Sequence, residues 1–347
     1  MAVETIATEV QGFCPLCASP GRPKYQSLND RLFGAPGVWN IKECERQDCG
    51  SLWLDPRPTP EDVGKAYLEY YTHGEPTGVK KVVAAALRTL GREYSAFRYG
   101  FPASRLPRAA RPLAAGLVRL YPGLAQHLDL LTRYLPAERM GNGRLLDVGC
   151  GDGQALAFLA ALGWQVSGVE VDANAASVAR GRGLDVHQGT LSQAGFADDS
   201  FDAVTSSHVI EHVHDCRAFL ADNRRVLRPG GSLVAVTPNA RAYTHHLHGQ
   251  DWMPLDPPRH LLLFTRDSLK TLAESAGFRD VRVLTTSRAV ALAHIASSEI
   301  RRQGRYQWGR WPGLPLWLRA QFQQVLAPLL MRLGQAEGDE LVLLATK

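Results

Sequence analysis

The 347-residue sequence lacks long apolar runs: no stretch of about 18 apolar residues occurs, so we expect no membrane span. It also lacks a basic start followed by an apolar core, so we expect no secretory signal at the N-terminus. Only six cysteines occur, which is too few for a disulfide scaffold. The formal charge of +5 is too small to indicate nucleic-acid binding by itself. We therefore expect a globular protein of two or three domains in a reducing cytoplasm.

Four of the six cysteines lie in two short-spaced pairs. Cys14 and Cys17 form a C-x2-C turn, and after 26 intervening residues Cys44 and Cys49 form a second, looser pair. Zinc takes four thiolates in a tetrahedron, which two such pairs on facing turns provide. Alternating residues at 38–42 predict a strand that leads into the second pair. We predict a small ribbon holding one structural Zn2+ ion through all four sulfurs; two pairs of free buried cysteines are the alternative.

The most informative stretch is residues 145–153, LLDVGCGDG. Its apolar residues predict a buried parallel strand, and its glycines permit a sharp turn at which a ligand can approach the backbone. A helix is expected at 154–162, where Gly163 ends it. Further strands are expected at 165–170, 201–206 and 232–236. This alternation predicts an α/β, doubly wound sheet with a ligand crevice at the carboxyl ends of its strands.

Acidic residues at the turn help to select the cofactor of that crevice. Asp147 lies on the first strand and Asp152 lies inside the turn, and both would repel the pyrophosphate of a dinucleotide. S-adenosylmethionine carries an ammonium and a sulfonium, so electrostatics favour it. Glu170 ends the second strand, 23 residues after Asp147. An acid that binds ribose is expected at about that position.

With these residues the chain resembles the class I S-adenosylmethionine-dependent methyltransferases. Their first motif matches residues 146–153, and their later landmarks match 201–204, 211–213 and 227–231. Residues 339–347 resemble the terminal antiparallel strand of the family. The resemblance implies a Rossmann-like methyltransferase sheet that binds S-adenosylmethionine.

The resemblance also implies roles for individual residues at the cofactor. Glu170 would hold the ribose hydroxyls. Many members place an acid after the third strand for the adenine amino group, but residues 189–192 contain none, so backbone groups of Thr190 and Leu191 would serve instead. The remaining residues expected at the cofactor are Asp147, Gly149, Gly151, Val171 and His208.

The N-terminal segment resembles the zinc ribbon of one methyltransferase subgroup. The stretch WLDPRP at 53–58 and the stretch DPPRH at 256–260 both occur in that subgroup, whose members often act in glycan, lipid or secondary-metabolite pathways. We therefore expect three parts in the chain. They are a zinc ribbon at 1–65, a basic helical linker or lid at 66–140, and the methyltransferase domain at 141–347 with a helical insert at 287–336.

Methyl transfer to a hydroxyl benefits from a general base, most often histidine. The best candidate is His260, because it lies in a proline-rich loop expected over the carboxyl ends of the strands. His212 is the second candidate, although a cap or a cofactor contact would also explain it. The spacing of His208, Glu211 and His212 also matches the H-x-x-E-H signature of some zinc proteases, which is an alternative from another enzyme class. Tyr70, Tyr71 and His73 are expected either near the acceptor or in the core.

Two basic segments interrupt an otherwise acidic chain. Residues 79–139 hold 11 Lys and Arg against 3 Asp and Glu, and residues 287–335 hold 7 Arg against 1 Glu. Prolines limit the first to short helices, and the second mixes its arginines with Trp308, Trp311 and Leu318. Two interpretations stay open: a lid that admits an anionic or lipid-linked acceptor, and a surface in peripheral contact with a membrane.

We predict an S-adenosylmethionine-dependent methyltransferase acting on a small or carrier-linked acceptor, namely a glycan, a lipid or a secondary metabolite. Oxygen is the first choice of acceptor atom, with carbon and nitrogen open. An RNA methyltransferase is the alternative, since a zinc ribbon and arginine clusters can bind RNA. We do not expect nucleic acid as a binding partner, because residues 12–56 of the ribbon are nearly balanced in charge. The sequence predicts neither the acceptor nor the oligomeric state.

Overall fold

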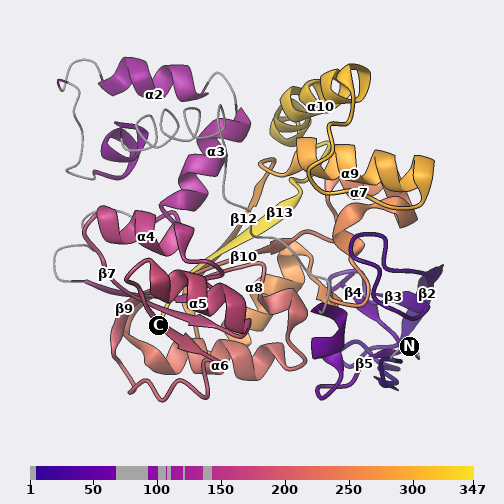
Figure 1. The fold of residues 1–347 in the computed structure, drawn as a ribbon, viewed down its shortest axis with the longest axis horizontal. Coiled ribbons are helices and arrows are strands. Elements are labelled where there is room, and N and C mark those ends of the chain that lie inside the picture. The colour runs from indigo at the N-terminus through magenta and orange to yellow at the C-terminus, as the bar shows by residue number, and fades with distance from the viewer. Residues whose placement is uncertain (1–4, 68–92, 101–106, 108–110, 120–121, 136–142) are drawn as a thin grey trace.

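The computed structural model describes residues 5–67, 93–100, 107, 111–119, 122–135 and 143–347 (Figure 1). Its centre is a seven-stranded sheet made of β6 (Arg144–Val148), β7 (Gln165–Glu170), β8 (Asp185–Gln188), β9 (Phe201–Ser207), β10 (Leu227–Pro238), β12 (Arg279–Thr286) and β13 (Glu340–Thr346). The strands lie in the order β12-β13-β10-β9-β6-β7-β8. Only β13 runs antiparallel to its neighbours within this sheet. The predicted doubly wound sheet with a terminal antiparallel strand is confirmed.

Helices cover both faces of this sheet. They are α4 (Gln154–Ala161), α5 (Ala173–Gly181), α6 (Cys216–Val226) and α8 (Arg266–Ser275). Adjacent residues of a strand point to opposite faces, and accordingly Leu146 packs with buried residues of α6 and α8, whereas Leu145 packs with those of α4 and α5. Side-chain caps begin three of these helices: Asp172 for α5, Asp215 for α6 and Thr265 for α8. The predicted helix after the glycine turn ends as expected before Gly163.

The N-terminal ribbon is an antiparallel sheet that continues into the methyltransferase region. Its strands are β2 (Gly21–Leu28), β3 (Trp39–Cys44) and β4 (Leu52–Leu54), and β1 (Thr8–Glu9) pairs with β5 (Arg57–Pro58) beside them. The fourth strand, β11 (Leu262–Leu263), comes from the DPPRH region and pairs with β4. Trp39 and Ile41 of the ribbon share a hydrophobic core with Trp252. The ribbon and the main body are therefore joined by both hydrogen bonds and a common core.

The remaining elements lie above the sheet in Figure 1 or connect its strands. The helices are α2 (Arg111–Arg119), α3 (Pro122–Leu131), α7 (Tyr243–His248), α9 (Val290–Gln303) and α10 (Leu314–Arg332). The short 3-10 turns are η1 (Val63–Tyr67), η4 (Ile210–His212), η5 (Gly249–Asp251) and η6 (Met253–Leu255). Most of the described residues in both basic segments are helical. Tyr70, Tyr71 and His73 lie outside the described residues. Within the described part of the chain, no helix combines the length and the apolar character needed to cross a bilayer.

Candidate active site

The glycine turn lies at the carboxyl end of β6. Gly149, Gly151 and Gly153 have φ angles of 73°, 57° and 79°, which other residues rarely adopt. A Cβ on Gly149 would lie 2.4 Å from Val209 Cγ2, and a Cβ on Gly153 would lie 2.4 Å from Leu184 Cδ1. The positive φ angles and these close approaches together favour glycine at both positions.

Glu170 ends β7 and braces this turn. Its Oε2 accepts a hydrogen bond from the N–H of Gly151 at 2.8 Å, and its Oε1 accepts one from Asp172 at 2.9 Å. A carboxylate has about four acceptor sites, so two remain for the hydroxyls of a ligand. Val171 follows and is 68% exposed, which leaves an apolar surface beside the carboxylate. Thr190 and Leu191 follow the neighbouring strand β8, where Thr190 is exposed and Leu191 is buried.

Asp147 is fully buried in the sheet. Its Oδ2 accepts a hydrogen bond from Arg133 at 3.0 Å, and its Oδ1 accepts one from the Thr205 hydroxyl at 2.6 Å. Arg133 and Tyr134 both have positive φ, at 52° and 55°, a strained conformation for residues with a Cβ. The carboxylate therefore holds Arg133 in place, and both of its oxygens are already engaged by protein groups.

His208 follows β9 and lies between two carboxylates. Its Nδ1 lies 3.1 Å from Glu211 Oε1, and its Nε2 lies 2.9 Å from Glu340 Oε1. Arg288 also donates to Glu340. Burial lowers the pKa of His208, but the hydrogen bonds to Glu211 and Glu340 outweigh burial and raise the pKa to about 9. At neutral pH His208 is an imidazolium with both nitrogens engaged, so it offers no lone pair as a base.

His260 and His212 lie edge to face beside this cluster, with ring centroids 4.7 Å apart. Nδ1 of His260 lies 2.7 Å from the Pro254 carbonyl oxygen, so it carries the proton and Nε2 keeps its lone pair. That Nε2 lies 4.0 Å from Glu211 Oε1 and 3.8 Å from Asp256 Oδ2. Burial lowers the pKa of both histidines to about 4, so both are neutral at pH 7. The structure thus brings the two predicted bases together.

The geometry does not favour a tetrahedral zinc ion at this cluster. Ligand atoms of Glu211, His212 and His260 lie within 4.8 Å of one another. Ligands of one tetrahedral zinc ion lie about 3.3 Å apart, given bonds of about 2.0 Å, and the 4.0 Å between Glu211 and His260 exceeds that spacing. His208 lies beyond a strand end and His212 lies in η4, so they do not share the helix that the protease signature needs.

A buried ion pair connects the His260 loop to the ribbon. Arg259 is fully buried, and its Nη1 lies 2.7 Å from Asp30 Oδ2 in the loop after β2. Its Nε donates to Asp256 at 3.1 Å, and its guanidinium lies 4.6 Å from the centroid of the Phe33 ring. The carbonyl oxygen of Arg259 lies 3.0 Å from His212 Nδ1. The ribbon therefore helps to position both neutral histidines.

The four ribbon cysteines converge as predicted. Sγ of Cys14 lies 3.7 Å from Sγ of Cys49, and Sγ of Cys17 lies 3.5 Å from Sγ of Cys44. A tetrahedron with Zn–S bonds of about 2.3 Å separates its sulfurs by about 3.8 Å. All four sulfurs lie within 4.8 Å of one another. The donor set and its spacing therefore fit one tetrahedral metal ion.

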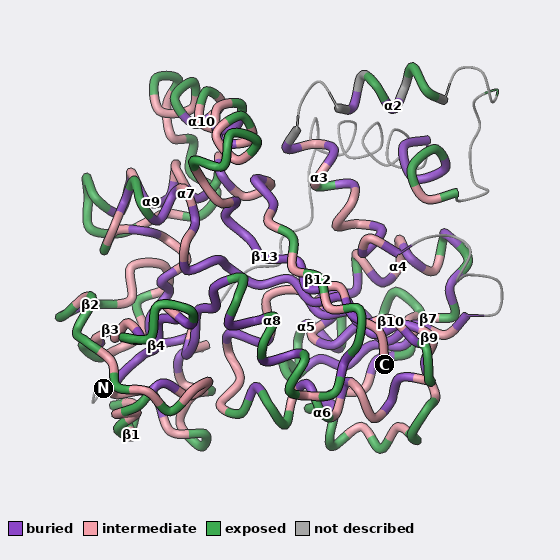
Figure 2. Tube along the Cα trace, turned by 180° about the vertical axis from the view of Figure 1, so that it is seen from behind, coloured by how far each residue is buried: buried purple, intermediate pink, exposed green. Residues whose placement is uncertain are grey.

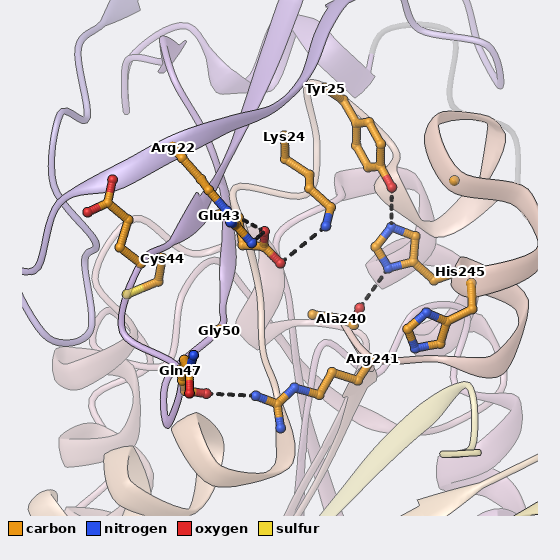
Figure 3. A pocket seen from close by; sticks show the side chains of 13 residues that line it. Arg22, Lys24, Tyr25, Glu43, Cys44, Gln47, Gly50, Ala240, Arg241 and His245 are labelled. Carbon is orange, nitrogen blue, oxygen red and sulfur yellow. Dashed lines mark hydrogen bonds and ion pairs between the residues drawn. The ribbon is translucent and has the colours of Figure 1, made fainter. Parts of the chain in front are cut away.

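A separate open groove of about 710 Å³ lies between the ribbon and α7 (Figure 3). Glu43 pairs with both Arg22 and Lys24 there, and Tyr25 donates to Nε2 of His245 at 2.9 Å. The sequence shows a dense group of histidines here, but His245 is held by Tyr25 and by the Ala240 carbonyl. Among the described residues these histidines form no metal cluster.

The sequence did not predict the residues that complete the site from distant positions in the chain. They are Arg133, Arg288 and Glu340, together with Asp30 of the ribbon. Arg133 lies in a stretch that mixes arginines with apolar residues, and no local sequence pattern identifies it as a partner of Asp147. The sequence indicates Glu340 only as part of the last strand, although an acid at the first position of an antiparallel strand lies at the same edge as the carboxyl ends of the parallel ones.

The chain also matches known proteins. A family profile described as "Methyltransferase domain" matches residues 120–283. A probable S-adenosylmethionine-dependent methyltransferase of Mycolicibacterium smegmatis is 32% identical over 203 residues, which cover 56% of this chain and 76% of that protein. A ubiquinone biosynthesis O-methyltransferase of Cereibacter sphaeroides is 32% identical over 150 residues, which cover 40% of this chain and 61% of that protein.

Among solved structures, an S-adenosylmethionine-dependent methyltransferase from Archaeoglobus fulgidus matches with a TM-score of 0.43 and 19% identity, covering 73% of this chain and 99% of that one. The strand order, the glycine turn and the match to the mycobacterial relative agree with the resemblance of the first motif. The chain belongs to the class I S-adenosylmethionine-dependent methyltransferases.

Proposed function

We propose that this methyltransferase methylates a hydroxyl group of a small or carrier-linked acceptor. The observation that carries the proposal is His260, a neutral histidine with a free Nε2 between two carboxylates near the carboxyl edge of the sheet. The similarity to a ubiquinone biosynthesis O-methyltransferase supports oxygen as the acceptor atom. Glycans, lipids and secondary metabolites remain the acceptor classes that we propose.

The crevice at β6 and β7 is the proposed cofactor site. When bound, S-adenosylmethionine supplies a methyl group already activated on a sulfonium. The backbone at Gly149 and Gly151 lets the cofactor approach closely, and the free acceptor sites of Glu170 receive its ribose hydroxyls. Val171 packs on the adenine, while Thr190 and Leu191 provide backbone groups at its edge. Asp147 contributes indirectly, because it fixes Arg133.

His260 acts as the general base in this proposal. Its Nδ1–H donates to the Pro254 carbonyl, which fixes the tautomer and leaves the Nε2 lone pair for the proton of the acceptor hydroxyl. Accepting that proton creates an imidazolium, which Glu211 at 4.0 Å and Asp256 at 3.8 Å stabilise. His212 packs against the ring and positions it.

We propose that Cys14, Cys17, Cys44 and Cys49 hold a structural Zn2+ ion. Four thiolates close the coordination sphere, so the ion supplies stability and no chemistry. Its contribution to the site passes through Asp30 of the ribbon, which fixes Arg259 next to the base.

Two measurements test the cofactor assignment separately from the base. Isothermal titration with S-adenosylmethionine should show saturable binding to the wild type. We expect Glu170→Ala to weaken that binding at least about tenfold through two lost charge-assisted hydrogen bonds. Asp185→Ala at the outer strand β8 is the matched control and should bind like the wild type. Absence of binding by the wild type would refute the proposed cofactor site.

The base is tested by product formation on a panel of phenols, alcohols and amines. His260→Gln should lower kcat on the hydroxyl acceptor by about 10²–10⁴-fold while the cofactor affinity is unchanged. His246→Gln, an exposed histidine in the groove, is the matched control. Because the pKa of His260 is lowered to about 4, the activity should stay level from pH 8 down to about 5. Full turnover by His260→Gln, or methylation of amines alone, would exclude this mechanism.

A further inference from the structure

The last helix, α10, buries small and polar residues and exposes large apolar ones, which is the opposite of the usual pattern. Its buried side consists of Ala320, Gln324 and Ala327, at helical spacing. Gln324 joins α10 to the start of α9, since it accepts from Ala291 and donates to the Ser287 carbonyl. The fully buried residues of the helix are thus small or polar, and several of its large apolar residues remain exposed.

The large apolar residues form an exposed stripe along the whole of α10. Six residues of the stripe are between 53% and 63% exposed: Leu314, Leu318, Phe322, Val325, Leu329 and Leu333. Their spacing of three or four residues puts them on one face of the helix. Trp311, which is 62% exposed, extends the stripe beyond the helix start, and Figure 2 marks the outer side of α10 as exposed. A continuous apolar surface of this kind marks an interaction site.

The charges around the stripe have one sign. Residues 300–336 contain six arginines and no Asp, Glu or Lys. Arg301 pairs with Asp251. For the other five arginines, no ion pair is found within the part of the chain that the structure describes. At about 100° per residue, Arg319 and Arg332 fall on the two borders of the stripe.

We propose that this face of α10 docks on the surface of an anionic lipid membrane. Large apolar residues enter the boundary between headgroups and acyl chains, and the bordering arginines reach the phosphates beside them. Tryptophan at the end of the stripe suits the same depth. The helix lies on the membrane and does not cross it.

The charges also argue against a second copy of the chain as the occupant. A symmetric dimer through this face would place Arg319 and Arg332 of each copy against the stripe of the other. The stripe offers no acid to pair with them, so like charges would meet without compensation. Anionic lipid supplies the missing negative charge. This inference does not depend on the acceptor or on the role of His260.

Vesicle sedimentation with the full chain tests the proposal. Vesicles of phosphatidylcholine with about 30% phosphatidylglycerol should bind the protein at low salt, and pure phosphatidylcholine should bind it at least about tenfold more weakly. Salt at about 0.5 M should release most of the protein, because screening weakens the arginine contacts. A blue shift of tryptophan emission should accompany binding.

Two triple variants locate the contact. L318Q/F322Q/L329Q removes the centre of the stripe and should weaken binding to anionic vesicles at least about tenfold. V10Q/V178Q/L284Q changes three apolar residues that are exposed elsewhere and should bind like the wild type. Both variants should keep the wild-type melting temperature within a few degrees, which shows that they fold.

R302Q/R319Q/R332Q should lose binding by roughly fivefold per arginine and with it most of the preference for anionic lipid. The proposal is overturned if the wild type does not bind anionic vesicles, or if the stripe variant binds as well as its control. It is also overturned if the wild type is a dimer by light scattering, the stripe variant is a monomer, and neither binds vesicles.

Discussion

The ribbon and the α9–α10 insert are both additions to the same methyltransferase sheet, but they meet it in opposite ways. The ribbon shares a strand pair, β4 with β11, and a core with the body. Its Ser51 hydroxyl bonds Ser268, and the carbonyl of Cys49 accepts from Thr265. Helix α10 fully buries only two alanines and a glutamine and leaves Leu314, Leu318 and Leu329 exposed.

This difference separates two roles for apolar residues in an added segment. Where large apolar side chains are buried, as at Trp39 and Trp53, the segment contributes to the stability of the whole molecule. Where they are exposed, as at Leu318 and Phe322, they contribute little to folding and remain available for another surface. Substitutions in the two regions should therefore have effects of very different size.

Loss of the metal should give the largest effect. Cys14→Ser removes one of four converging sulfurs, and we expect bound zinc to fall from one ion per chain to none. The free energy of unfolding should drop by at least about 4 kcal/mol, because binding a structural metal is part of folding. Metal analysis and denaturant unfolding measure both quantities. Cys216→Ser, a buried cysteine outside the cluster, is the control. An unchanged zinc content in Cys14→Ser would mean that the four cysteines do not hold a structural zinc ion.

Breaking the buried ion pair should have the next largest effect. Arg259→Met leaves Asp30 and Asp256 without their shared cation, and we expect a loss of about 3–5 kcal/mol in unfolding free energy. The matched control, Arg22→Met, removes an exposed partner of Glu43 and should lose no more than about 1 kcal/mol. Arg259→Met should also reduce turnover, since His260 is adjacent. Equal effects of the two variants would mean that the ribbon is tied to the body less firmly than its contacts indicate.

Local patterns predicted the elements that depend on neighbours in the sequence. Apolar runs and glycines predicted the strand and turn at 145–153, whereas the terminal strand at 339–347 was expected only from the family resemblance. The paired spacing of the cysteines predicted their convergence because each pair closes its own short turn. Glu170 was expected at the crevice for the same reason, since it ends a strand adjacent to the turn.

The contacts that complete the site join residues far apart in the sequence, and these could not be predicted. His208 and Glu340 are 132 residues apart, and Arg259 and Asp30 are 229 apart. Periodicity describes which face of an element is buried but not which polar group it meets there. Strand β11 has two residues, too few for any periodic pattern. For the same reason the sequence left both the lid and the membrane surface open for the arginine-rich insert, because its pattern does not show which apolar residues are exposed.

The ion pairs at the start of the insert should make a smaller, pH-dependent contribution to the free energy of unfolding. Arg288, just before α9, and His208 both bind Glu340. Because hydrogen bonds to Glu211 and Glu340 raise the pKa of His208 from 6.5 to about 9, its charge stabilises the fold fully below about pH 6.5 and ceases to do so as the pH rises through about 9. We expect a contribution of about 1 kcal/mol, discounted because the side chain is 38% exposed.

Denaturant unfolding at pH 6, 7, 8, 9 and 10 measures this contribution. The wild type should lose stability across that series, and His208→Gln should lose less over the same range. His187→Gln, on the outer strand β8, serves as the control and should follow the wild type. A parallel decline in all three proteins would mean that His208 is not protonated, and that the insert is attached without this ion pair.

The smallest effect should come from the stripe itself, and it tests the comparison most directly. Leu54→Gln and Leu318→Gln are the same chemical change at residues that are 1% and 53% exposed. In the ribbon the change buries an amide and removes packing, so we expect a loss of about 3 kcal/mol or more in unfolding free energy. On α10 it should stay within about 0.5 kcal/mol, because the side chain is already in water. A large loss at Leu318 would mean that the stripe packs against part of the chain in solution, and α10 would then resemble the ribbon.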